Sequence, residues 1–156
     1  MKRIFLVINI FYVFSNIVYC QGFDDNKTAL SNFIKRMYNA NSFEGIKIIE
    51  DYDAKYLISV LSLEKANYTS TSTMNRVAQV KAQSQASIFF NGSEITTEFI
   101  IKTSEEKVNE SDVIKTIQTI ETVKENSVGF VKQLELLTNF EIENGKRVLF
   151  IFIKQM

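Results

Sequence analysis

Apolar residues recur along this chain with two different periods, which predict two helices and several strands. A first helix is predicted from Thr28 to Asn39, where apolar residues return every three or four positions. These positions are Leu30, Phe33, Ile34, Met37 and Tyr38. A second helix is predicted from Ser72 to Phe90, and Asn91-Gly92 is expected to end it with Gly92 in the left-handed conformation. The inner side of this helix is expected to hold Met74, Val77, Ala78, Ala82, Ala86 and Phe89.

Strand-like patterns fill most of the remaining chain. The clearest runs from Lys55 to Leu63, where both faces are apolar, and a strand buried on both faces is usually central in its sheet. The segment 113–123 also fits a helical stripe, but we assign it to a strand because it is rich in β-branched residues. Asn144-Gly145 lies between two apolar runs and predicts a hairpin. The other predicted strands are 46–49, 94–103, 130–140 and 146–154.

Together these elements predict an α+β fold. We expect an antiparallel sheet of about five strands, packed by one long helix, with an additional N-terminal helix. The content of 46% hydrophobic residues and the 13 Phe are sufficient for a packed core. We expect a single domain over residues 28–156, preceded by a polar lead-in at 21–27.

The first 20 residues have the order of a secretory signal. Lys2 and Arg3 precede an apolar run from Ile4 to Tyr19, which is short for a membrane-spanning helix, and the chain turns polar at Gln21. Cleavage after Cys20 would leave Gln21 as the N-terminus. Alternatively, Cys20 could be lipidated, although bulky Tyr19 precedes it, or the segment could remain as an anchor. The protein is therefore expected to be exported, and to be periplasmic, outer-membrane-associated or extracellular.

Composition limits the chemistry of the exported part. The chain has no His, and its one Cys falls in the predicted signal, so the commonest general base and the thiol nucleophiles are missing. Without residues 1–20 the chain carries 16 basic and 18 acidic residues, a net charge of −2. This near-neutral balance gives no basic footprint for nucleic acid. We expect no catalytic residue, no cofactor and no metal site.

Several patterns offer chemistry, and each has a simpler structural reading. Ser62 and Lys65 match S-x-x-K, but they close a strand, where positions i and i+3 point to opposite faces. Glu98 and Glu121 could form a carboxylate pair across neighbouring strands, but charged sheet edges also favour solubility. The acidic group Glu50, Asp51 and Asp53 could bind Ca²⁺, but it lacks the glycine and distal Glu of a calcium loop and is expected to be a turn.

Two further patterns depend on context. Four Asn residues begin N-x-[ST] sequons, which are glycan sites only in a eukaryotic secretory pathway. They are Asn26, Asn67, Asn91 and Asn109. An aromatic group is expected to pack in the core, or alternatively to line a groove for lipid or peptide. It contains Phe130, Phe140, Phe150 and Phe152.

Residues 54–155 are predicted to form a strand, a helix with alanines at every fourth position, a further strand and a closing hairpin. The residues that mark this order are Ala78, Ala82, Ala86, Gly92, Gly129 and Asn144-Gly145 before Val148 to Ile153. In these features the chain resembles a bacterial envelope family, typified by LPP-type outer-membrane lipoproteins and flagellar outer-membrane ring assembly proteins. The resemblance implies an α+β module for assembly or scaffolding and no known catalytic residues.

We therefore expect an exported, non-enzymatic envelope module for assembly or protein–protein interaction. The alternative is a carrier that binds a small apolar ligand between helix and sheet, which would need a cavity there. The expected partner is an envelope protein. Membrane association is expected only if Cys20 is lipidated.

Overall fold

The computed structural model describes residues 25–51, 54–92, 100–103, 110–124 and 127–156. The predicted signal peptide, Cys20 and residues 21–24 of the lead-in lie outside these ranges. The chain divides into two compact units, Met1–Leu30 and Ser31–Met156. The first is described only from residue 25, where helix α2 (Asp25–Ala40) begins. The sheet and the other described helices belong to the second unit.

Five strands form one sheet in the order β3-β1-β2-β5-β4. Their bounds are β1 Gly45–Asp51, β2 Ala54–Glu64, β3 Ile100–Lys102, β4 Glu135–Ile142 and β5 Arg147–Gln155. β2 is the middle strand, as its two apolar faces predict. β3 runs parallel to β1, whereas the other three pairings are antiparallel, so the expectation of a wholly antiparallel sheet is correct only in part.

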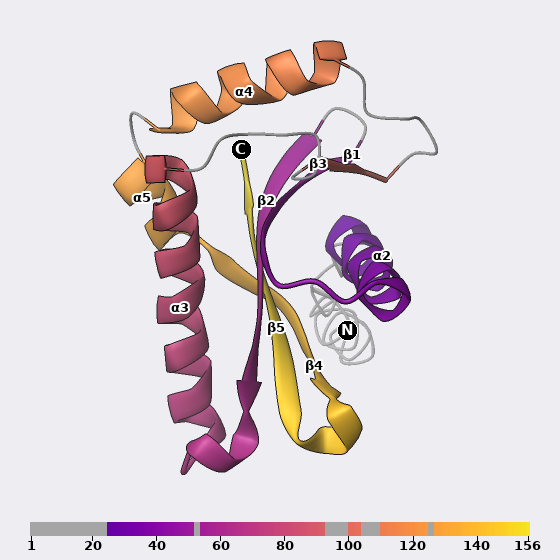
Figure 1. Cartoon of the computed structure of the whole chain (residues 1–156), viewed down its shortest axis with the longest axis vertical. Helices are drawn as coiled ribbons and strands as arrows, with labels where there is room; N and C mark the ends of the chain where they lie inside the picture. The colour runs from indigo at the N-terminus through magenta and orange to yellow at the C-terminus, as the bar shows by residue number, and fades with distance from the viewer. Residues whose placement is uncertain (1–24, 52–53, 93–99, 104–109, 125–126) are drawn as a thin grey trace, which may run out of the picture. The chain divides into compact units, whose positions relative to one another are not determined.

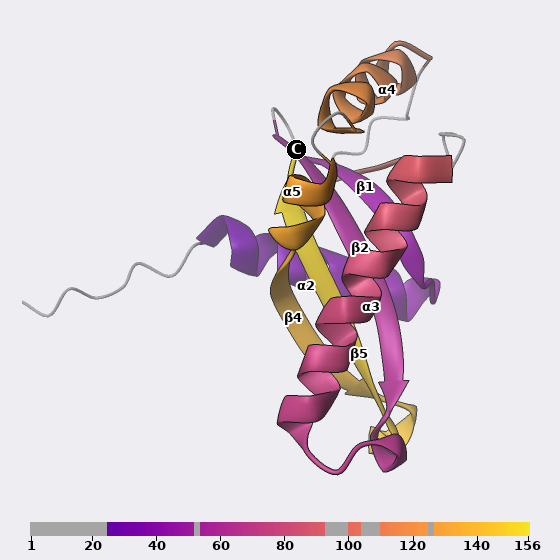
Figure 2. The same ribbon diagram turned by 90° about the vertical axis from the view of Figure 1, so that its left-hand side faces the viewer.

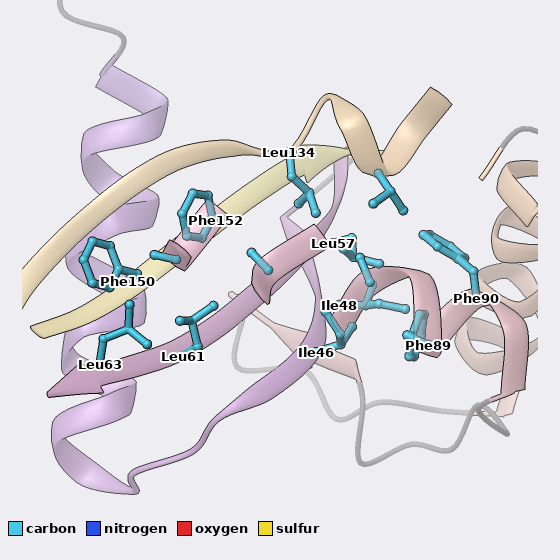
Figure 3. Close-up of a cluster of buried hydrophobic side chains, with 14 of the residues drawn as sticks. Ile46, Ile48, Leu57, Leu61, Leu63, Phe89, Phe90, Leu134, Phe150 and Phe152 are labelled. Atoms are coloured by element: carbon cyan, nitrogen blue, oxygen red, sulfur yellow. The ribbon is translucent and has the colours of Figure 1, made fainter. Parts of the chain in front are cut away.

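Helix α3 (Thr71–Gly92) lies along one face of the sheet, as Figures 1 and 2 show. Met74, Phe89 and the three alanines of its inner side are buried, as the sequence predicts. Figure 3 shows the side chains that they meet, which come from alternate positions of the central strands. They include Leu57, Leu61 and Leu63 of β2 and Phe150 and Phe152 of β5. Gly92 is still helical and lacks a positive φ, so the expected left-handed end at this residue is wrong.

The opposite face of the sheet is also buried. Ile58 and Val60 of β2 and Leu149 and Ile151 of β5 are fully covered. Tyr38 of α2 contacts Phe140 of β4 edge to face, with ring centroids 6.0 Å apart. Both faces of the central strands are covered, which explains why these strands are apolar on both faces.

One predicted strand is wrong and another is correct only in part. Residues 113–123 belong to helix α4 (Glu110–Lys124), and the helical stripe places Ile120 in the core. Tertiary burial of that stripe outweighs the weak strand propensity of its β-branched residues. The segment 130–140 is divided between helix α5 (Ser127–Lys132) and strand β4. Of the segment 94–103, the structure describes 100–103, which contains β3. The described part of the chain thus has four α-helices, where two helices were expected.

The hairpin between β4 and β5 is confirmed. Ile142 pairs with Arg147, so four residues connect the strands. Glu143, Asn144 and Gly145 have positive φ values of 51°, 54° and 81°. Asn and Gly adopt this conformation more readily than most residues, which is why the Asn-Gly pair marks the turn.

Candidate functional site

The outer edge of β4 is the candidate site that the fold presents most openly. β4 is the last strand on its side of the sheet, and no other strand in the described part of the chain pairs with its outer edge. It has eight residues; of the features that protect exposed edges it lacks Lys and Pro but has a bulge and the charged residues Glu135 and Glu141. An edge of this length leaves a row of backbone groups available to a further strand.

The two faces of β4 differ. Leu136 pairs with Phe152 and lies on the α3 face, where it is 41% exposed. Phe140 pairs with Leu149 and lies on the other face, where it is half-buried against Tyr38. A bulge between Leu136 and Thr138 bends the strand. A strand added here would therefore meet an apolar side chain on each face.

A polar cluster closes the end of the sheet near the β4–β5 turn. β1 begins at Gly45, opposite Val60, so the last residues of β2 extend beyond it. The carboxylate of Glu44 accepts a hydrogen bond from the backbone N–H of Ser62 at 3.3 Å and another from its hydroxyl. The Glu44 side chain thereby replaces the missing strand partner of Ser62.

Arg147 connects the β4–β5 turn to Ser62 and Glu44. Its guanidinium donates to the Ser62 hydroxyl and to Glu143 at 3.1 Å, and it lies 3.5 Å from Glu44. The hydrogen bond to Glu143 raises the pKa of Arg147, and the charges of Glu143 and Glu44 act in the same direction. Arg147 therefore stays charged, and its guanidinium links Ser62, Glu143 and Glu44.

The S-x-x-K residues lie in this region but do not form a catalytic pair. Ser62 bonds to Glu44 and Arg147, whereas the Lys65 ammonium pairs with Glu141 of β4. Lys65 begins a short 3₁₀ helix, Lys65–Asn67, directly after β2. Both side chains are thus engaged in separate contacts that hold the strand end.

The acidic residues that were weighed as a Ca²⁺ site and expected to form a turn make other contacts. Glu50 pairs with Lys55 at 2.8 Å, and Asp51 accepts a hydrogen bond from the Thr103 hydroxyl at 2.5 Å. Asp53 lies outside the described residues. Within the described ranges, no group of three or more His, Cys, Asp or Glu residues is arranged to hold a metal ion.

The carboxylate pair that was weighed against a charged sheet edge does not lie on two strands. Glu121 belongs to helix α4, and Glu98 lies outside the described residues. Since the predicted strand at 113–123 is a helix, the cross-strand geometry assumed for this pair is wrong.

The sequons and the aromatic residues lie in different environments. Asn26, Asn67 and Asn91 are exposed, and Asn109 lies outside the described residues. The aromatic residues pack as core: Phe150 and Phe152 are almost fully buried. Phe130 contacts Phe90 edge to face at 5.4 Å, and Phe140 contacts Tyr38.

Sequence reasoning missed the cluster of Glu44, Ser62 and Arg147. These residues are far apart in the sequence, and only the strand register brings them together. The one signal for this cluster in the sequence is Arg147, a charged residue directly before the buried run 148–153.

Comparison of the chain with protein-family models, curated proteins and solved structures gives no match. Within the described ranges, no helix combines the length and apolar character needed to cross a membrane.

Proposed function

We propose that this chain is an exported, non-enzymatic envelope module that binds another protein by strand addition at the outer edge of β4. The observation that carries this proposal is the unpaired outer edge of an eight-residue strand, seen in the described part of the sheet. Strand addition uses backbone hydrogen bonds for affinity and side chains on each face for specificity.

The cellular context of the proposal comes from the sequence. The basic-then-apolar order of residues 1–20 supports export, and the resemblance to envelope proteins supports a partner in the same compartment. The near-neutral charge gives no support to a nucleic-acid partner. We propose contact with a membrane only if Cys20 is lipidated.

Packing between α3 and the sheet supports a binding module over a carrier of apolar ligands. Ala78, Ala82 and Ala86 are all 0% exposed, so the helix backbone lies close to the strands along its length. Ser59 of β2 reaches across this interface and donates to Gln85 of α3 at 2.6 Å. A carrier would need an apolar cavity in the same space.

A photo-crosslinking amino acid at Leu136 tests the proposal in cells that export the protein. Leu136 lies on the open edge and is 41% exposed. The matched control is Val128 of α5, an apolar residue that is 71% exposed and lies outside β4. We expect a discrete crosslink to an exported protein from position 136 and none to that protein from position 128.

The variant Leu136→Lys tests in the same assay whether the partner pairs with the outer edge of β4. A lysine on an edge strand disfavours further strand pairing, so we expect Leu136→Lys to weaken recovery of the partner while Val128→Lys leaves it unchanged. Equal recovery with both variants, or crosslinking only from position 128, would contradict strand addition at β4.

A further inference from the structure

The chain contains two Asn-Gly pairs, and the fold places them in different structures. Asn91-Gly92 lies in the last turn of helix α3. Asn144-Gly145 lies in the β4–β5 turn, at the lower end of Figure 1. Both asparagines are exposed, so water reaches both side chains. An asparagine loses its side-chain amide most readily when glycine follows it, because glycine has no side chain to hinder attack by its own backbone nitrogen.

This deamidation needs only the chain and water. The backbone nitrogen of the glycine attacks the asparagine Cγ, a C–N bond forms, and the side-chain amide nitrogen leaves as ammonia with the proton of the glycine N–H. The product is a cyclic succinimide. Water then opens the ring: attack at Cγ gives aspartate, whereas attack at the main-chain carbonyl carbon of the former asparagine gives isoaspartate. In isoaspartate the main chain runs through Cβ and Cγ.

Helix α3 hinders the reaction at Asn91. Gly92 is helical, so its N–H belongs to the hydrogen-bonded backbone of the helix. The Asn91 side-chain amide donates to the Ser87 hydroxyl at 3.4 Å. Attack by the Gly92 nitrogen therefore requires that the last helical turn open first.

The β4–β5 turn hinders the reaction at Asn144 less. A hydrogen bond across the turn runs from the N–H of Lys146 to the carbonyl of Glu143 at 3.2 Å, so it does not occupy the Gly145 nitrogen. The Asn144 side chain forms no hydrogen bond with a described residue. Asn144 has a ψ of 39°, and ring closure requires the peptide between Asn144 and Gly145 to rotate. An exposed connection of four residues rotates at a lower cost than a hydrogen-bonded helical turn.

We propose that Asn144 is a site of spontaneous deamidation and that it converts faster than Asn91 in the folded protein. Isoaspartate at position 144 adds a main-chain carbon between Glu143 and Gly145 and places a new carboxylate in the turn. Glu143 accepts a hydrogen bond from Arg147 at 3.1 Å, so distortion of the turn loosens the hold of Glu143 on Arg147 and on the polar cluster. The site is separate from the outer edge of β4 and does not depend on strand addition.

Peptide mass spectrometry of the full exported chain, aged in mildly alkaline buffer, tests the site. Conversion of an amide to an acid raises the peptide mass, and chromatography separates isoaspartate from aspartate. We expect Asn144 to convert about tenfold faster than Asn91, a ratio that corresponds to an opening cost of about 1.4 kcal/mol at the helix end. In urea, where both pairs are unfolded, the two rates should become similar. The internal control is Asn139, which precedes Phe140 in β4 and should stay intact.

Two variants test the reaction and its consequence. Asn144→Gln keeps an amide but would have to close a larger ring, so position 144 should stay unconverted while Asn91 reacts as before. Asn144→Asp carries the new charge without the extra main-chain carbon. The purified isoaspartate form should unfold at a lower urea concentration than Asn144→Asp, and equal midpoints would contradict the loosening of the polar cluster. The proposal is overturned if Asn144 stays intact in the folded protein, or if Asn91 converts there at least as fast.

Discussion

Replacing Ala82 with Leu tests the close contact between α3 and the sheet. Ala82 lies in the middle of the helix and is 0% exposed, as are Ala78 and Ala86 on either side. An isobutyl group in place of a methyl group has no space at this interface and would push the helix away from β2. Overpacking of this kind costs about 1–3 kcal/mol. Leu and Ala have similar helix propensities, so the intrinsic change in the helix adds little.

Urea unfolding followed by circular dichroism measures this free-energy change. We expect the midpoint of Ala82→Leu to fall with an unchanged slope, which signals lower stability without a change in the unfolding mechanism. The matched control is Ser84→Leu, which places the same side chain on the exposed side of the same helix. If Ala82→Leu unfolds at the same urea concentration as the unmodified protein, Ala82 does not face the sheet and the packing described for α3 is wrong.

Three further substitutions test single contacts by the same unfolding measurement. Ser59→Ala should cost about 1–3 kcal/mol because the buried hydroxyl donates to Gln85, and a cost within error would contradict that bond. Gly145→Ala should cost about 1–2 kcal/mol, since Gly145 has a φ of 81° and the new Cβ would lie 3.0 Å from Glu141 Oε2. Gly129→Ala should instead raise stability by about 0.5–1 kcal/mol, because a Cβ there meets nothing within 4 Å. A loss of stability at Gly129 would show a contact that the structure lacks.

The central part of the fold is predictable because each sequence pattern there favours one local structure. A run that is apolar on both faces, such as 55–63, must be covered on both sides, and it forms the middle strand. The alanines at every fourth position of 72–90 require a neighbour at close range, and the helix packs there on the sheet. Asn144-Gly145 suits a turn with positive φ, and the hairpin follows.

The rest depends on contacts that the local sequence does not contain. The segment 113–123 has both a helical stripe and a β-branched composition, and burial of Ile120 decides for the helix. The parallel pairing of β3 with β1 requires a crossover whose path no short pattern specifies. The polar cluster likewise forms only when the strand register brings Glu44 and Arg147 to the same end of the sheet.

Amide hydrogen exchange of β4 tests strand addition most directly. It is measured residue by residue in the free protein and in the complex with the partner that crosslinking identifies. In the free protein, the outward-facing amides of Glu135–Ile142 have no strand partner within the described sheet and should exchange faster than those of β5. The account predicts that the partner slows exchange at these alternate outward amides of β4. Protection confined to another surface, with the outward amides of β4 unchanged, would contradict it.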